Sequence, residues 1–106
     1  MDKHDISPDV VVLFEFNGSR KGFVCSGYRP GHLIKENYIT TGIHNYNNKI
    51  LVEPDGKAIG TITFISPECY PHCLCEGDKI AIIDGTKTVG HAIILEVLNP
   101  ILKGKG

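Results

Sequence analysis

Residues 76–98 read EGDKIAIIDGTKTVGHAIILEVL, and this stretch decides the fold of the 106-residue chain. Residues 80–83 form a short apolar, β-branched run, and residues 88–98 form a second β-rich run. Asp84-Gly85 between them tolerates the positive φ that a tight turn needs, so the stretch predicts a β-hairpin. Alternate residues of the second run point to opposite faces, and both faces carry apolar side chains. We therefore expect the hairpin to lie inside a closed or two-layered β structure.

The remaining chain is also composed of short β-rich segments separated by turn formers, with no helical periodicity. Six or seven such strands predict an all-β barrel or sandwich. The length suits a single domain. We expect a polar lead over residues 1–9, one barrel over residues 10–98 and a flexible tail over residues 99–106.

The composition narrows the classes of function. Lys and Arg number 11 against 12 Asp and Glu, a formal net charge of −1, whereas a general nucleic-acid binder usually carries a basic excess. No apolar run approaches the roughly 20 residues of a membrane helix, and the polar N-terminus does not suggest a signal peptide. We therefore expect a reducing, cytoplasmic location in which the four cysteines remain thiols.

Four stretches, in the right order, carry a resemblance to a known family. They are FVCSGYRP at residues 23–30, Thr41-Gly42, the segment between Pro54 and Pro67, and residues 76–90 with GTKTVG after the turn. Together they resemble the C-terminal, third domain of translation elongation factor Tu and elongation factor 1-alpha, over residues 10–98. The resemblance implies a six-stranded antiparallel Greek-key β-barrel.

The resemblance implies a surface rather than a catalytic site. The chain lacks the glycine-rich phosphate loop of the family's GTPase, so we expect a free-standing domain that binds no nucleotide and needs no cofactor. In the family this barrel contacts the T-stem of aminoacyl-tRNA, packs on the GTPase domain and receives partner proteins. We therefore expect a non-catalytic module that contacts a protein, as a mimic, a decoy or an antitoxin-like neutraliser. An RNA-binding module is the alternative.

The family positions that face tRNA are kept in part. Arg29, Thr41 and Gly90 are kept, Gly31 replaces a glutamine, and Lys87 replaces an arginine and so loses the planar fork suited to phosphate. This pattern permits RNA contact through an Arg29–Lys87 face without requiring it. The candidate residues for binding RNA or a partner are Arg20, Lys21, Arg29, Thr41, Lys87 and Gly90.

Basic and aromatic side chains are interleaved between residues 20 and 38. The set consists of Arg20, Lys21, Arg29, His32 and Lys35 with Tyr28 and Tyr38. Such a pattern can follow a nucleic-acid backbone and stack bases, but it is also common on solvated loops. Three acids, Glu36, Glu53 and Asp55, dilute its charge.

The segment CYPHCLC at residues 69–75 has the highest density of side chains that can bind metal or be oxidised. Its thiols and imidazole are ligands that zinc prefers, and the candidates are Cys69, His72, Cys73 and Cys75, with Cys25 as a distant fourth thiol. The spacing is not that of a zinc knuckle. A metal site, a redox-sensitive loop and a plain loop with partly buried thiols all remain open.

No group of residues has the pattern of a catalytic site. Neither a nucleophile elbow nor a pair of carboxylates on one strand face is present, so we do not expect an enzyme. His91 falls on the strand face of Val89 and Ile93. It is either a histidine of the core or barrel edge, or one with a role at an interface.

Overall fold

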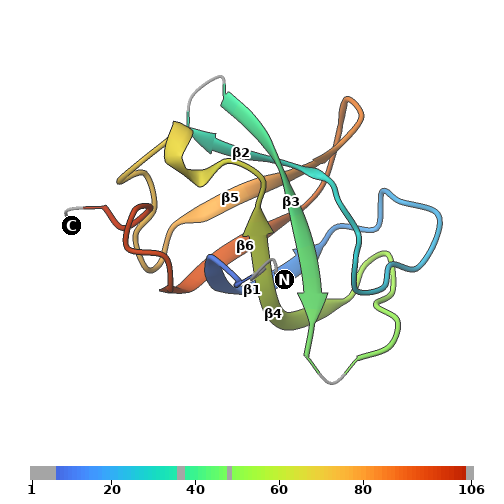
Figure 1. Ribbon diagram of the computed structural model, residues 1–106. Helices are drawn as coiled ribbons and strands as arrows, with labels where there is room; N and C mark the ends of the chain where they lie inside the picture. Colours follow the sequence, from blue (N-terminus) through green and yellow to red (C-terminus); the bar gives the residue numbers. More distant parts are fainter. Residues whose placement is uncertain (1–6, 36–37, 48, 105–106) are drawn as a thin grey trace, which may run out of the picture.

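Six antiparallel strands close into a β-barrel in the computed structural model, which describes residues 7–35, 38–47 and 49–104 (Figure 1). Apart from the 3₁₀ turn η1, Pro67–Cys69, these described residues contain no helix, and none could therefore span a membrane. The strands are β1 Val10–Phe16, β2 Gly31–Lys35, β3 Tyr38–Tyr46, β4 Lys57–Phe64, β5 Lys79–Asp84 and β6 Lys87–Val97.

The strand order is β1-β4-β3-β2-β5-β6, and β6 pairs with β1 to complete the circle. Strands β2, β3 and β4 follow one another, and β4 lies beside β1, which is a Greek key. The predicted fold class is confirmed. The hairpin over residues 76–98 is confirmed as well, as β5 and β6. Residues 23–25 and 50–52 are too short for the wall and form loop segments joined by a single bridge from Val24 to Val52.

Alternating hydrophobic residues explain why these segments form the wall. Along β1, Val10, Val12, Phe14 and Phe16 are buried in the barrel, and the residues between them are half-buried on the outside. Side chains from all six strands fill the interior, as in other small barrels. Their burial is the main favourable contribution to folding.

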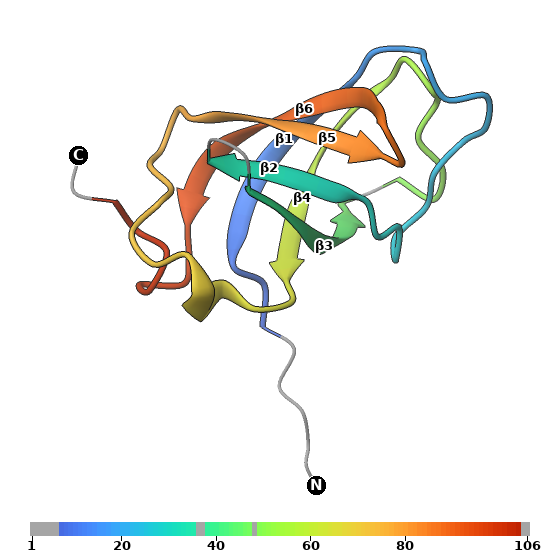
Figure 2. The same cartoon turned by 90° about the horizontal axis from the view of Figure 1, so that it is seen from above.

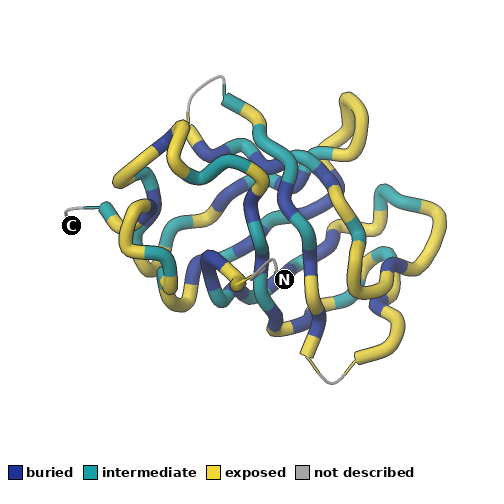
Figure 3. Tube along the Cα trace, in the orientation of Figure 1, coloured by how far each residue is buried: buried dark blue, intermediate teal, exposed yellow. Residues whose placement is uncertain are grey.

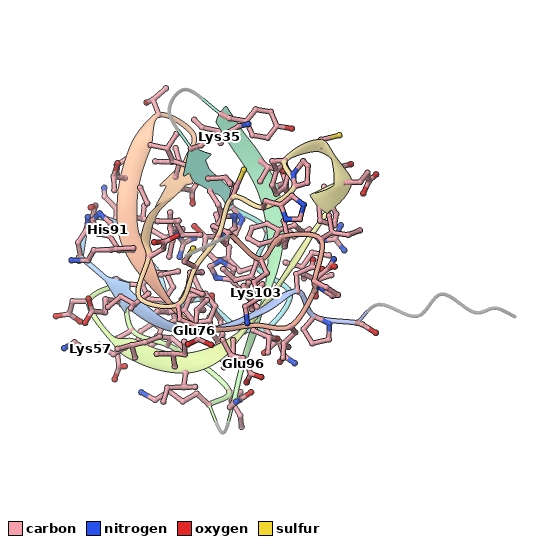
Figure 4. All side chains as sticks on the ribbon, turned by 90° about the vertical axis from the view of Figure 1, so that its left-hand side faces the viewer. Lys35, Lys57, Glu76, His91, Glu96 and Lys103 are labelled. Atoms are coloured by element: carbon pink, nitrogen blue, oxygen red, sulfur yellow. The ribbon has the colours of Figure 1, made fainter. Side chains whose placement is uncertain are left out.

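A β-bulge at Val89 changes which residues of β6 face inward. Ile82 pairs with Gly90 and Ile83 with Thr88, so Val89 is an extra residue, and Val89 and Gly90 are both buried. Beyond the bulge the inner face carries Ala92 and Ile94. The expectation that His91 shares the face of Val89 is therefore wrong. His91 lies on the outer wall opposite Glu15, and its side chain points away from the barrel (Figure 4).

The expectation of a flexible tail over residues 99–106 is wrong for residues 99–104. Leu102 is fully buried, and its carbonyl accepts a hydrogen bond from the Leu74 amide at 2.9 Å. Burial of this leucine and pairing of the backbone fix the segment against the loop after β4 (Figure 3). Residues 105–106 lie outside the described residues.

The polar lead is also only partly as expected. Asp9 is buried, and its carboxylate accepts hydrogen bonds from the Phe64 amide at 2.7 Å and from the Asn99 side chain at 2.8 Å. The carboxylate therefore joins the lead to β4 and to the C-terminal segment. Residues 1–6 of the lead lie outside the described residues.

The connections gather at two ends of the barrel. The long segment 17–30, the β3–β4 connection and the β5–β6 turn all lie at one end, on the right of Figure 2. The loop between β4 and β5 and the C-terminal segment lie at the other end.

Candidate binding face

The candidate site is the first of these two ends, which we call the loop face, formed by residues 17–30, 49–56 and 84–88. At its centre the carboxylate Oδ2 of Asp84 accepts a hydrogen bond from the Tyr28 hydroxyl at 2.7 Å and one from Arg20 Nε at 3.2 Å. The Arg20 guanidinium also lies 4.8 Å from the centre of the Tyr28 ring. Because the Tyr28 hydroxyl and Arg20 both stabilise its charge, the pKa of Asp84 is lowered. Burial raises the pKa of Tyr28.

Further hydrogen bonds join the segments of the loop face. Lys87 Nζ donates to the Ser19 carbonyl at 3.2 Å, and the Asn17 side chain donates to the Thr88 carbonyl at 2.9 Å. Gly18 has a φ of 84°, a conformation that suits glycine, and its amide donates to the Pro54 carbonyl at 2.8 Å. The three segments of the loop face are therefore fixed relative to one another.

Three predicted candidates meet on this face. Arg20, Lys21 and Lys87 line a shallow hollow of about 230 Å³ together with Asp84 and Val89. Its described lining contains no pair of groups arranged as a nucleophile and its base.

The other three candidates are distributed differently. Arg29 is exposed at the end of the 17–30 segment and forms no ion pair with the described residues. Thr41 is half-buried on the side wall, opposite Gly31. Gly90 is buried, and a Cβ there would overlap with the Glu15 carbonyl, so this glycine allows β6 to approach β1 closely. The expectation that Gly90 lines a binding surface is wrong.

The basic and aromatic set is not one patch. His32 is fully buried in the barrel, because β2 alternates and His32 shares its inner face with Ile34. Lys35 lies 6.0 Å from the Tyr38 ring where β2 meets β3, away from the loop face. Glu36, one of the acids expected to reduce the charge of this set, lies outside the described residues.

Exposed apolar side chains on the loop face were missed by the sequence reasoning. The amides and carbonyls of Val24 and Val52 pair at 3.0 and 2.8 Å, and both valines point inward. Phe23 and Leu51, next to these valines, therefore point outward and are 56% and 54% exposed, and Ile50 in the same segment as Leu51 is 88% exposed. The sequence feature that could have indicated these exposed side chains is the presence of apolar residues in segments too short to form strands.

A hydrogen-bonded chain inside the barrel was also missed. His32 Nε2 lies 2.7 Å from His44 Nε2, and His44 Nδ1 lies 2.8 Å from the Tyr46 hydroxyl. Burial lowers the pKa of His32 to about 4, and burial together with His32 lowers the pKa of His44 well below its usual value. Alternation along residues 42–46 could have placed His44 and Tyr46 on one inner face.

The cysteine-rich loop has its apolar residues inside and its reactive ones outside. Tyr70 and Leu74 are fully buried, whereas Cys69 is exposed and Cys73 and Cys75 are half-buried thiols. His72 Nδ1 is 2.9 Å from the Lys103 carbonyl. Within the described part of the chain, no three His, Cys, Asp or Glu side chains are grouped as metal ligands. This arrangement gives no support to a metal site.

No family model matches this chain. The barrel is the fold that the resemblance to the elongation factor domain implies, but one fold serves many functions. The function is therefore argued from the loop face itself.

Proposed function

We propose that this protein is a non-catalytic binding module, related to the third domain of elongation factor Tu, that contacts a partner protein through the loop face. The observation that carries the proposal is the exposure of Phe23, Ile50 and Leu51 in the two loop segments that the Val24–Val52 bridge joins, segments that also carry the exposed cations Lys21 and Lys49. An apolar patch rimmed by charges is typical of protein contact sites. The matching surface therefore carries apolar side chains. Such a module can act as a mimic, a decoy or a neutraliser.

The order of the loop face favours binding. The hydrogen bonds of Asp84, Lys87 and Gly18 hold the three segments together before any partner arrives. A preordered surface loses little conformational entropy on association, so more of the contact energy appears as affinity.

The contacts favour a protein partner over RNA. Arg20 is paired with Asp84, and Lys87 donates to the Ser19 carbonyl, so both cations already have partners within the loop face, and the Asp84 carboxylate offsets part of their charge. The Tyr28 ring lies against Arg20 and the buried His44, so it is not available to stack a base. Exposed aliphatic side chains such as Ile50 add little to phosphate binding but much to a protein interface.

Capture from cell lysate with tagged protein and matched variants tests the proposal. Phe23→Ser and Leu51→Ser remove apolar surface from the loop face, and Ile59→Ser removes a comparably exposed isoleucine, 50% exposed, from the β4 wall. We expect proteins that bind the wild type and Ile59→Ser but are lost with both loop-face variants. An identical set of captured proteins for all four chains contradicts the proposal, and so does the absence of any protein above background.

RNA binding stays a second candidate because Lys21, Arg29 and Lys49 are exposed on the same face and form no ion pair with the described residues. A mobility-shift assay with tRNA at low and moderate salt, using Arg29→Ala and Lys21→Ala, tests it. Binding that weakens with salt and with both changes supports an RNA role. Absence of binding at low salt rules it out.

A further inference from the structure

The buried chain of His32, His44 and Tyr46 has a defined direction. The Thr40 carbonyl can only accept, so His32 Nδ1, 3.3 Å away, carries the hydrogen and His32 Nε2 is left as an acceptor. His44 Nε2 must then donate across the 2.7 Å contact, which leaves His44 Nδ1 to accept from the Tyr46 hydroxyl. Each group is neutral, and each hydrogen has one acceptor.

The surroundings of the two imidazoles are almost entirely apolar. Strand β1 contributes Phe14, whose ring centre is 4.3 Å from that of His44, and β4 contributes Phe64, 5.6 Å from His32. The titratable groups nearby are Tyr46 on β3 and Tyr28 on the 17–30 segment, with the Asp84–Arg20 pair beyond the Tyr28 hydroxyl. No described carboxylate is hydrogen-bonded to either imidazole. A positive charge on the pair would have no partner there.

The chain lies directly beneath the loop face. The His44 ring meets the edge of the Tyr28 ring, with centres 5.5 Å apart and planes at 90°. The His44 amide donates to the Tyr28 carbonyl at 2.9 Å, and the Gly27 amide donates to the His44 carbonyl at 2.8 Å. The Ser26 hydroxyl accepts from the Tyr46 amide at 3.0 Å. Residues 26–28 therefore lie against His44 and are held by β3, the strand that carries it.

A proton can enter this chain at His44 Nδ1 or, if the chain reverses, at His32, and in both cases His44 Nδ1 then donates to the Tyr46 hydroxyl. Protonated His32 would donate from Nε2, His44 would accept there and donate from Nδ1, and the Tyr46 hydroxyl would lose its acceptor. The result is an unpaired charge and an unsatisfied hydroxyl in an apolar interior, both of which are unfavourable. Contact with water would relieve both, and residues 26–28 lie over His44.

We propose that the neutral His32–His44 pair positions residues 26–28 of the loop face, and that a proton taken up by the pair releases this segment from the barrel and weakens partner binding. His44 is a positioning residue because it acts through Tyr28 and not by contact with the partner. The effect on binding rests on the proposed function, whereas the release of the segment does not.

Amide hydrogen exchange followed by NMR tests the release without any partner. The probes are the amides of Gly27 and His44, and the reference is the Ile94 amide, bonded to the Asp78 carbonyl at 2.8 Å. As the pH falls below about 7 we expect the two probes to lose at least about tenfold in protection, and to lose protection completely at a pH at which the Ile94 amide is still protected. Complete loss of protection at all three amides at the same pH, or no loss at the two probes, overturns the proposal.

Variants separate this effect from general acid sensitivity. His44→Gln keeps an amide donor and removes the central imidazole, so the acid-induced loss of protection at the Gly27 amide should disappear. His91→Gln, on the outer wall, should leave that loss unchanged. If the Gly27 amide of His44→Gln still loses protection in acid, the proposal is overturned. If His44→Gln does not fold, the wild-type protection factors alone decide.

Partner binding adds an independent readout. A partner captured at neutral pH should leave the wild type on washing at about pH 5 and stay bound to His44→Gln. Retention on the wild type while the Gly27 amide still opens would refute the use of residues 26–28 in binding, and would leave the proton-driven release intact.

Discussion

The hydroxyl of Tyr28 and the carboxylate of Asp84 are 56 residues apart in the chain and 2.7 Å apart in space. This hydrogen bond joins the segment after β1 to the end of β5, just before the turn into β6. The loop face is therefore a single surface built from separate parts of the sequence, and its order can be tested by changing either residue.

Asp84→Asn should loosen the loop face and cost little global stability. The amide cannot hold the charge-assisted bonds to Tyr28 and Arg20, and since the pair is partly exposed we expect a loss of about 1 kcal/mol or less in the free energy of unfolding. Urea denaturation at neutral pH measures this loss. Asp55→Asn is the control, since Asp55 is exposed on the same face.

The effect of Asp84 should depend on pH with a definite sign. Its pKa is lowered by the Tyr28 hydroxyl and by Arg20, so its contribution is present at neutral pH and is lost as the pH falls through its folded-state pKa. The wild type and Asp84→Asn should therefore converge in acid. A difference in stability that stays constant down to the lowest pH would contradict this interpretation.

Gly60→Ala should prevent the barrel from closing normally. A Cβ at Gly60 would overlap with the Asn45 carbonyl on β3, and backbone can yield there only by breaking the β3–β4 ladder. We expect a loss of more than about 3 kcal/mol in unfolding free energy, or failure to fold. Thermal and urea denaturation test this, with Gly22→Ala as the control because a Cβ there meets nothing within 4 Å. Similar stabilities for the two variants would be evidence against the close β3–β4 approach.

The free energy of unfolding should fall in mild acid because of His32. Its pKa is lowered by burial from the ordinary value of 6.5 to about 4 in the folded protein, so the unfolded chain binds more protons between these values. Stability should be constant above about pH 6.5 and decrease toward about pH 4, by at most roughly 3 kcal/mol for this residue. Urea denaturation across this range gives the measurement. A flat profile would mean that the pair can be protonated without cost.

Leu102→Ala should destabilise the whole barrel although the residue lies close to the C-terminus. Its side chain is fully buried, and truncation of a buried leucine costs about 3 kcal/mol. Ile101→Ala, at a neighbouring residue that is 44% exposed, should cost much less. Equal effects in denaturation experiments would indicate that the C-terminal segment does not pack as described.

The sequence was most informative where local patterns dominate. Alternation along β1 and the Asp84-Gly85 turn predicted the wall and the hairpin, because both depend on neighbouring residues. The face of His91 was predicted wrongly, since a bulge at Val89 arises from pairing with β5, which no local pattern displays. The packing of Leu102 was missed for the same reason, because Leu74, its backbone partner, is distant in the chain.

The candidate site was predicted only in part. The cations Arg20, Lys21 and Lys87 were identified by residue type and by resemblance, and the fold brings them together. The sequence could not reveal that Arg20 forms an ion pair with Asp84 or that His32 is buried beside His44. Nor could it show that Phe23 and Leu51 are exposed. Each of these features depends on tertiary contacts.

The pairing of β6 with β1 limits how another chain can associate with this one. In the described barrel each strand has a neighbour on both sides, so the wall offers no strand edge to which a foreign strand could be added. Association by strand addition, whether in a specific complex or in aggregation, is therefore disfavoured while the barrel stays closed. Selectivity must come from side chains and loops, which can vary without disturbing the wall.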